Sequence, residues 1–188
     1  ATSKDKTLEK YTSVLRENVE ELNGLIQEIL DFRKAEDAGF SHTHIRRVSV
    51  SSLLRTQFEW FYPLSEQHQI QFKIDAPKEL YWNTDSVYFK KILANLISNA
   101  FKYTEDGGTV RISLHEEENF LVLKVYNTGK GIEEADMQNI FDRYRILGTM
   151  DNDDNRQNTA RNGLGLFICH SLVQSLGGKI DIESEVGQ

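Results

Sequence analysis

The sequence is poor in several residue types, and each shortage excludes a class of protein. Its single cysteine, Cys169, excludes an internal disulfide among 188 residues and suits a reducing compartment. No apolar run is long enough to cross a bilayer, and we expect no signal peptide at Ala1. The sequence has 22 Lys and Arg residues and 29 Asp and Glu residues, which gives a net charge of -7. This charge argues against nucleic acid or an anionic membrane as the main partner. We therefore expect a soluble, cytoplasmic protein segment without direct membrane contact.

Apolar residues recur at heptad spacing over about residues 4–36, which predicts one long helix. The stripe is wider than a two-stranded seam and is interrupted once, by Asn18. Its members are Leu8, Tyr11, Val14, Leu15, Val19, Leu22, Leu25, Ile26, Ile29, Leu30 and Phe32. A stripe of this width favours a helical bundle formed between chains over a helix packed on its own domain.

The rest of the chain predicts a separate globular domain at residues 49–188, after a polar linker at 39–48. Expected helices begin after Ser49 or Ser51 and after Asp85, with a short one at 133–139 and a last one at 164–176. Strands are expected at 70–75, 109–114 and 120–126, and another starts within 179–185. Because strands and helices segregate along the chain, the predicted class is α+β, a two-layer α/β sandwich with a mixed sheet, preceded by the long bundle-forming helix.

Two asparagines mark the helix that follows Asp85. Asn95 and Asn99 are one turn apart and share a face, which Lys102 and Tyr103 continue. Carboxamide oxygens are suitable ligands for Mg²⁺, and a lysine suits phosphate. The residues alone leave two readings open: a magnesium nucleotide site, or asparagines that cap nearby loops.

Glycine pairs follow in two later loops. Gly129 and Gly131 come directly after an expected strand, and Gly163 and Gly165 precede an expected helix, whose N-terminal N–H groups suit phosphate. Residues 150–162 lie between the two pairs and are rich in Asp, Asn and Arg. We expect this segment to be a mobile loop. Each pair alone is a weak signal, but the order of these segments is hard to obtain by chance.

In that order the segments resemble the catalytic and ATP-binding domain of sensor histidine kinases. This domain belongs to a superfamily that includes type II topoisomerases, Hsp90 chaperones and mismatch-repair ATPases. Residues 95–104 resemble the N box, 127–132 the first glycine box, 140–144 the F box and 162–166 the second glycine box. Residues 28–36 resemble the end of the second helix of the dimerisation and phosphotransfer domain, in particular that of hybrid two-component sensors, so residues 1–38 are expected to be part of that domain.

The resemblance implies ATP and Mg²⁺ as cofactors and a Bergerat-type ATP-binding fold. It implies that Asn99 binds magnesium, that Lys102 and Arg143 lie near phosphate, and that Tyr103 lies near the ribose or phosphates. The other nucleotide contacts that it implies are Asn127, Gly129, Gly131 and Ile132 around adenine, Tyr144 in the F box, and Gly163, Leu164, Gly165 and Leu166 at the end of a lid.

Asn95 stands where the ATPase relatives carry a glutamate base. A carboxamide cannot abstract a proton at neutral pH, so we expect poor activation of water and transfer of phosphate to a histidine instead. Asn127 replaces the aspartate of the first glycine box; loss of its charge predicts adenine binding weakened roughly tenfold, about 1.4 kcal/mol. Arg161 replaces a glycine of the second box and reaches either phosphate or solvent.

The five histidines lack the sequence surroundings of a phosphoacceptor, so we expect the acceptor histidine on a helix outside this sequence. They are His42, His44, His68, His115 and His170. The resemblance implies a homodimer through the N-terminal helix, a response-regulator or receiver-domain partner, and a location in the soluble part of a membrane-bound sensor. It also implies a further glycine box and a final strand after Gln188, so that the sheet is one strand short. Two other functions stay open: an ATP hydrolase of the same superfamily, and a nucleotide-binding-impaired dimerisation module.

Overall fold

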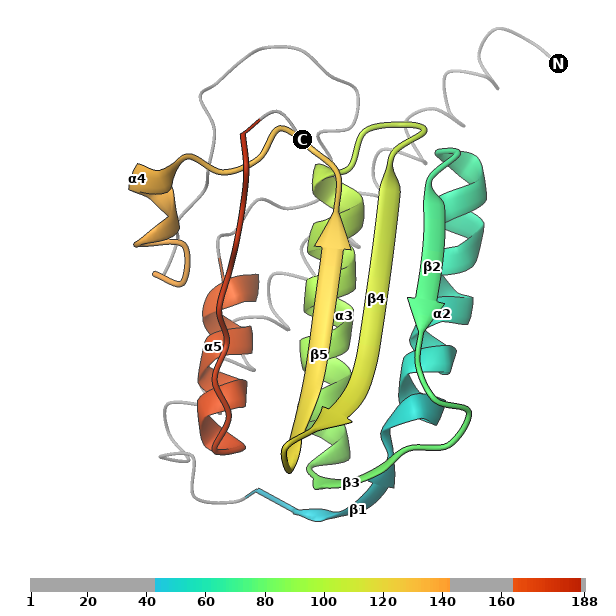
Figure 1. The fold of residues 1–188 in the computed structure, drawn as a ribbon, viewed down its shortest axis with the longest axis vertical. Coiled ribbons are helices and arrows are strands. Elements are labelled where there is room, and N and C mark those ends of the chain that lie inside the picture. The colour runs from blue at the N-terminus through green and yellow to red at the C-terminus, as the bar shows by residue number, and fades with distance from the viewer. Residues whose placement is uncertain (1–42, 143–163, 187–188) are drawn as a thin grey trace, which may run out of the picture.

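The computed structural model describes residues 43–142 and 164–186, which form two layers (Figure 1). The predicted helix at 1–38 and the site candidates Arg143, Tyr144, Arg161 and Gly163 lie outside the described residues. The domain boundaries therefore stay a prediction.

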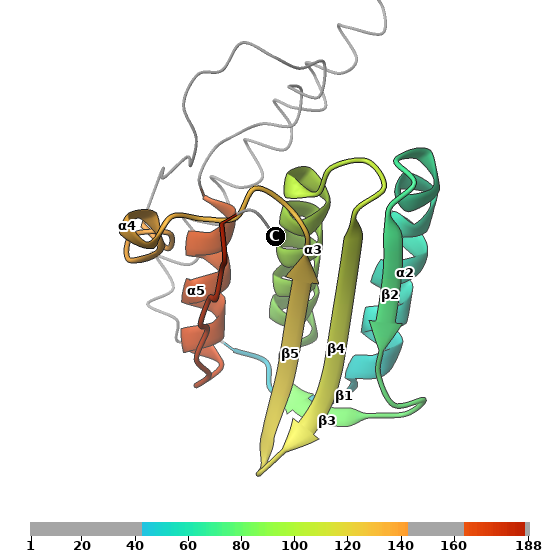
Figure 2. The ribbon, with the colours of Figure 1, turned by 45° about the horizontal axis from the view of Figure 1, so that its top comes forward.

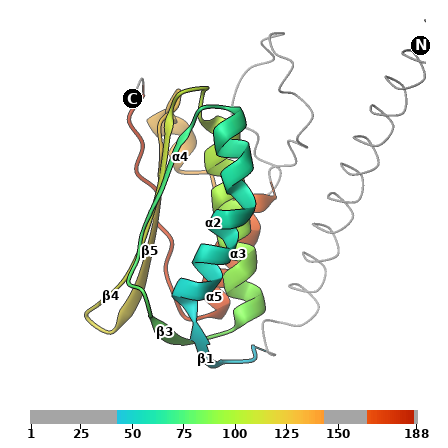
Figure 3. The same ribbon diagram turned by 90° about the vertical axis from the view of Figure 1, so that its right-hand side faces the viewer.

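A mixed three-stranded sheet forms one layer and helices form the other (Figure 3). The sheet has the order β2-β4-β5, with β2 (Gln71–Asp75) parallel to β4 (Thr109–Glu117), and β4 antiparallel to β5 (Phe120–Asn127). Helices α2 (Val50–Gln67), α3 (Ser86–Tyr103) and α5 (Gly165–Ser175) cover one face, and the short α4 (Glu134–Met137) follows β5. The predicted α+β sandwich with a mixed sheet is confirmed.

The β4–β5 hairpin closes through a two-residue turn. Glu118 and Asn119 both have positive φ, 47° and 71°, the conformation of the tight turns whose twist matches that of the flanking strands. Glu117 is consequently paired with Phe120, and the register runs without interruption to Val110 opposite Asn127. The strands extend beyond the predicted bounds because the turn is this short.

The main core lies between the sheet and helices α2 and α3. Alternation in β4 turns Val110, Ile112 and Leu114 inward, and all three are fully buried. Phenylalanines bridge the layers: the ring of Phe72 stacks on Phe58 at 4.5 Å between centroids and meets Phe101 edge-on at 4.9 Å. The apolar face predicted for α2 packs on this core.

A second, smaller cluster fixes α5 against α3. Leu164, Ile168 and Leu172 recur at helical spacing on α5 and bury themselves against Ile92 of α3. Gly177, with φ of +73°, ends this helix, as the glycine pair there predicts. The start of α5 is therefore held beside the middle of α3.

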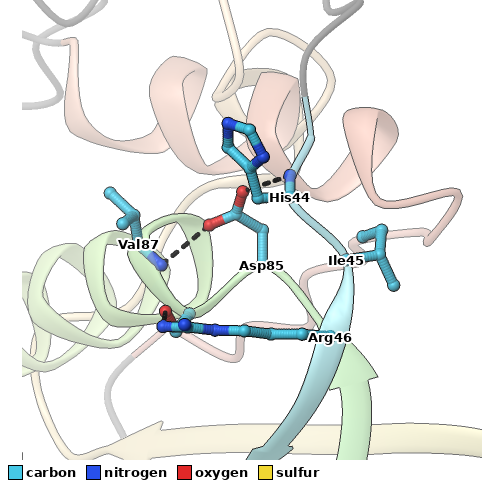
Figure 4. Close-up of a pocket in the computed structure, with 6 residues that line it drawn as sticks. His44, Ile45, Arg46, Asp85 and Val87 are labelled. Atoms are coloured by element: carbon cyan, nitrogen blue, oxygen red, sulfur yellow. Dashed lines mark hydrogen bonds between the residues drawn. The ribbon is translucent and has the colours of Figure 1, made fainter.

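Asp85 caps α3 as predicted. Its Oδ1 accepts hydrogen bonds from the N–H groups of Val87 at 2.8 Å and Tyr88 at 3.2 Å, and its Oδ2 accepts one from the N–H of His44 at 2.8 Å (Figure 4). Burial by itself raises the pKa of Asp85, but the backbone donors outweigh burial and lower the pKa below its usual value. By contrast, Ser49 occupies the cap position of α2 without a side-chain cap bond.

Two parts of the sequence prediction differ from the structure. Strands β1 (Arg46–Ser49) and β3 (Tyr81–Thr84) pair as a separate antiparallel ribbon, so β1 starts inside the segment expected to be a linker. The strand expected within 179–185 is wrong, because this stretch pairs with no described strand. It alternates half-buried Ile180 and Ile182 with exposed residues, a strand-like pattern without the ladder of hydrogen bonds.

Candidate functional site

The asparagine face of α3 is half-buried, and its amides have no partner among the residues that the structure describes. Asn95 and Asn99 are both half-buried, and neither side chain forms a hydrogen bond with any described residue. No side-chain polar atom in the described part is fully buried without a hydrogen bond. The two carboxamides are therefore accessible as well as unpaired, the state expected of groups that receive a ligand.

The N-terminus of α5 faces these two amides. A Cβ atom at Gly165 would lie 3.5 Å from Oδ1 of Asn95 and 3.8 Å from Nδ2 of Asn99. Among the described residues, no side chain caps this helix end, and its first turn carries no acidic residue. Leu164, which is 3% exposed, anchors this helix end in the core. The start of α5 and the two carboxamides thus lie close together, an arrangement that suits an anionic ligand with a metal ion.

The first glycine loop crosses the C-terminal end of α3. Figure 2 shows the segment after β5 running toward α4 across the upper ends of α3 and α5. A Cβ at Gly129 would lie 2.5 Å from the carbonyl oxygen of Tyr103, so only glycine permits this approach. Thr128 fastens the loop to β4, because its N–H donates to the carbonyl of Thr109 and its Oγ1 accepts from the N–H of Thr109.

The far end of this loop is held by the last described segment. Gly131 has φ of +74°, and a side chain there would collide with the backbone of Glu185 and Val186. The N–H of Ile132 donates to Oγ of Ser184 at 2.8 Å. Residues 179–186 therefore support the loop although they add no strand to the sheet.

Asn127 ends β5 at the mouth of the loop. Its Nδ2 donates to the carbonyl oxygen of Thr128 at 3.1 Å, which leaves its Oδ1 as a free acceptor among the described residues. At the end of α3, Tyr103 is 50% exposed, and the Nζ of Lys102 lies 5.8 Å from the centroid of its ring. The loop, this helix end and the start of α5 thus surround one region.

The predicted site residues that the structure describes all lie on the three segments around this region. Their positions are given by α3, the loop after β5 and the first turn of α5; they are Asn95, Asn99, Lys102, Tyr103, Asn127, Gly129, Gly131, Ile132, Leu164, Gly165 and Leu166. Thr128 and Ser184, which hold the loop, were not among the residues predicted from the sequence. A threonine directly before a Gly-x-Gly loop was a signal for the first, whereas nothing in the sequence links Ser184 to a loop more than 50 residues earlier.

A hollow elsewhere in the domain does not belong to this site. It has a volume of about 460 Å³ and is lined by His44, Ile45, Arg46, Asp85, Ser86 and Val87 (Figure 4). Ten residues of α3 separate Asp85 from Asn95, about 15 Å along the helix axis. The carboxylate of Asp85 already serves as the cap of α3, so the described lining of the hollow offers no free acidic group.

Two further reactive side chains have structural roles. Cys169 is fully buried, and burial raises the pKa of its thiol to about 12, which makes it inert at neutral pH. The ring of His170 stacks on Phe141 at 5.3 Å between centroids, so it connects α5 with the start of the F box. In residues 43–142 and 164–186, no three His, Cys, Asp or Glu side chains gather as a metal site, and no helix is long and apolar enough to span a membrane.

Comparison with known proteins identifies the family. The model of the histidine kinase-, DNA gyrase B- and HSP90-like ATPases matches residues 84–188, more than half of the chain. The chain belongs to this family. The match begins next to the Asp85 cap and includes α3, both glycine segments and α5, and it confirms the resemblance drawn from the sequence.

Sensor proteins are similar over the whole chain. The sensor protein IrlS of Burkholderia pseudomallei is 28% identical over 98% of this chain, which spans only 39% of IrlS. Full-length ShkA in complex with AMPPNP covers 96% of the chain at 24% identity, with a TM-score of 0.76 and 36% of ShkA covered. The histidine kinase ThkA in complex with the response regulator protein TrrA has a TM-score of 0.68 at 22% identity, covering 92% of this chain and 46% of ThkA. These structures confirm the fold.

Proposed function

We propose that this chain binds Mg-ATP and transfers its γ-phosphoryl group to a histidine on a dimerisation helix outside this sequence, in two-component signal transduction. The observation that carries the proposal is the close approach of the start of α5, at Gly165, to the amides of Asn95 and Asn99, which have no hydrogen-bond partner among the described residues. Family membership and the similarity to sensor proteins support the same function.

The described residues fit Mg-ATP. The Oδ1 of Asn99 is a hard ligand for Mg²⁺, and the positive N-terminal end of α5 suits phosphate oxygens. Lys102, in the last turn of α3, adds positive charge for the phosphates, and the Oδ1 of Asn127 accepts from the amino group of adenine. When bound, Mg-ATP supplies the activated phosphoryl group.

Asn95 decides between transfer and hydrolysis in this proposal. The amide borders the phosphate space but cannot act as a base, so a water molecule there is positioned without being deprotonated. Catalysis then depends on orientation and charge neutralisation, as in other phosphoryl transfers. This disfavours the ATP hydrolase of the same superfamily; steady phosphate release without a histidine substrate would restore it.

The whole protein's partners follow the same proposal. We expect a homodimer through the N-terminal helix at residues 1–38 and phosphotransfer to a response regulator; the ThkA–TrrA complex supports the second partner. Arg143, Tyr144 and Gly163, outside the described residues, keep their proposed roles near the nucleotide. A soluble, cytoplasmic position next to a membrane-bound sensor segment is part of this proposal.

Calorimetric titration with a non-hydrolysable ATP analogue tests the site directly. With magnesium present, we expect Asn99→Ala to bind the analogue at least tenfold more weakly than the unchanged protein, about 1.4 kcal/mol. Magnesium should no longer improve binding to this variant, because the proposed metal ligand is missing. Asn83→Ala, which removes an exposed asparagine of β3, is the matched control and should bind normally.

Two results would contradict the proposal. If the unchanged protein binds no adenine nucleotide, the chain is a dimerisation module with a decayed site. If Asn99→Ala retains both full affinity and its magnesium dependence, the metal is held elsewhere. Phosphotransfer is measured separately, by label transferred from ATP to a histidine-bearing dimerisation helix added in trans, with no label expected on the chain's own histidines.

A further inference from the structure

The outer face of the sheet carries charges and aromatic rings in a pattern that the proposed function does not use. Alternation turns every second side chain of β4 and β5 away from the helical layer. No described helix lies on that side (Figure 3). The exposed aromatic side chains there are Phe120, 66% exposed, and Tyr126, 52% exposed.

The strand register arranges these side chains in four rows. From one end to the other, the rows are Arg111 with Tyr126, Ser113 with Lys124, His115 with Val122, and Glu117 with Phe120. Each end row thus contains one charged residue on β4 and one aromatic residue on β5, and the charges are of opposite sign. We call these four rows the outer face.

The cationic end lacks a partner among the described residues. Arg111 lies directly beside Lys73 in the parallel register of β2 and β4, a cross-strand pair of like charges that weakens a sheet. The side chains of Lys73, Arg111 and Lys124 form no ion pair or hydrogen bond with any described residue. At the other end, the carboxylate of Glu117 contacts only His115 of its own strand, at 3.4 Å.

We propose that the outer face is a self-association surface on which a second copy of this chain packs face to face. The two-fold axis runs in the plane of the interface and across the strands, between the second and third rows. This operation places Arg111 over Glu117 of the second copy and Tyr126 over Phe120 of the second copy, and it repeats both pairs by symmetry. Lys124 then lies over Val122, with its methylene groups on the apolar side chain.

A second copy fits better than another acidic partner because the face is complementary to itself. An acidic partner alone would satisfy Arg111 and Lys73 but would repel Glu117 and leave Phe120 exposed. Face-to-face packing of two sheets with aligned strands is also a common arrangement in proteins.

The surface is small, so the association is weak. Four rows span about 20 Å along the strands, and two strands span about 10 Å, which gives on the order of 200 Å² on each copy. Stable complexes bury about 800 Å² on each partner. We therefore expect the contact at high protein concentration, or where another contact already links two copies and raises their effective concentration.

Crosslinking of the full 188-residue chain tests the geometry. Proteins with Tyr126→Cys and Phe120→Cys, one carrying a mass tag, are mixed with a short bis-maleimide. The native thiol can remain because Cys169 is buried. Tagged-to-untagged crosslinks should form in the mixture, whereas neither protein should crosslink to itself. Phe120→Cys mixed with Trp60→Cys, placed at a 78% exposed position on the helical layer, measures the background from random collisions.

Charge reversal tests the ion pairs in the same assay. Arg111→Glu or Glu117→Arg alone should lower the crosslink yield about tenfold, since each places like charges together. The double variant should restore the yield, because the pair is formed again with reversed signs. Melting curves of each variant check that it is folded.

Three outcomes overturn the proposal. These are a mixture yield equal to the Trp60→Cys background, crosslinking of Tyr126→Cys to itself, and a double variant that stays as weak as the single ones. None of these outcomes bears on nucleotide binding, which is proposed at α3, the start of α5 and the loop after β5 and is measured by titration with an ATP analogue.

Discussion

Gly165→Ala separates the folding role of this glycine from its proposed role in binding. The added methyl group would lie 3.5 Å from Oδ1 of Asn95 and 3.8 Å from Nδ2 of Asn99, which are ordinary van der Waals distances. No clash therefore opposes folding. The position is the first residue of α5, where alanine restricts the unfolded chain more than glycine does.

The substitution should leave stability unchanged or raise it, but it should lower the affinity for nucleotide. We expect the free energy of unfolding to stay unchanged or to rise by up to about 1 kcal/mol. For a chain of this length such a gain raises Tm by about 2–4 °C. Affinity for Mg-ATP should instead fall at least tenfold, since the methyl group occupies the space proposed for the phosphates.

Thermal unfolding without nucleotide and titration with a non-hydrolysable ATP analogue measure the two effects. Asn83→Ala, at an exposed position of β3 outside the proposed site, is the control and should leave the affinity unchanged. A folded Gly165→Ala protein that binds the analogue with unchanged affinity would refute the assignment of phosphate to the start of α5. A protein that fails to fold would refute the contact distances on which the reasoning depends.

Two further predictions concern stability. Gly129→Ala should lower the free energy of unfolding by about 1–3 kcal/mol, because its Cβ would lie 2.5 Å from the carbonyl oxygen of Tyr103 and the backbone must move. Denaturant unfolding measures this change. A Gly129→Ala protein as stable as Gly165→Ala would contradict it. Asp85→Ala should cost about 1 kcal/mol through the lost helix cap. Since the pKa of Asp85 is lowered in the folded state, its ionised form stabilises the protein above the unfolded pKa of about 3.9, and this stabilisation is lost as pH falls through the lower folded pKa. The variant should therefore lose less stability than the unchanged protein in unfolding measured from pH 5 to pH 3, and parallel curves would contradict the role of the carboxylate.

Local sequence rules predicted the elements whose signals are local. Asp85 stands before an apolar-periodic stretch, and the structure has the cap and the helix that follows it. The sequence predicts a strand at residues 109–114, and β4 contains it, with Val110, Ile112 and Leu114 fully buried. The signals for these elements lie within short stretches of the chain, which a single sequence records.

The differences arise where pairing partners are distant. Strands β1 and β3 are four residues each and lie 35 positions apart, so neither carries a pattern strong enough to predict the ribbon. Ile180 and Ile182 alternate as in a strand, but alternation reports only which side chains turn inward and not whether the backbone finds a ladder. Thr128 and Ser184 hold the glycine loop through contacts that sequence spacing does not contain.

The two glycine pairs looked equivalent in sequence, and the structure separates them. Gly129 and Gly131 are required by the protein itself, because a side chain at either position would meet backbone atoms of Tyr103 or Glu185. Gly165 is not required by any such contact, since a methyl group fits there. Gly165 lies beside the two carboxamides at the start of α5, and the proposed nucleotide would account for a glycine that the fold does not need. Gly165, which the folded protein could replace by alanine, therefore supports the proposed nucleotide site more strongly than Gly129 and Gly131 do.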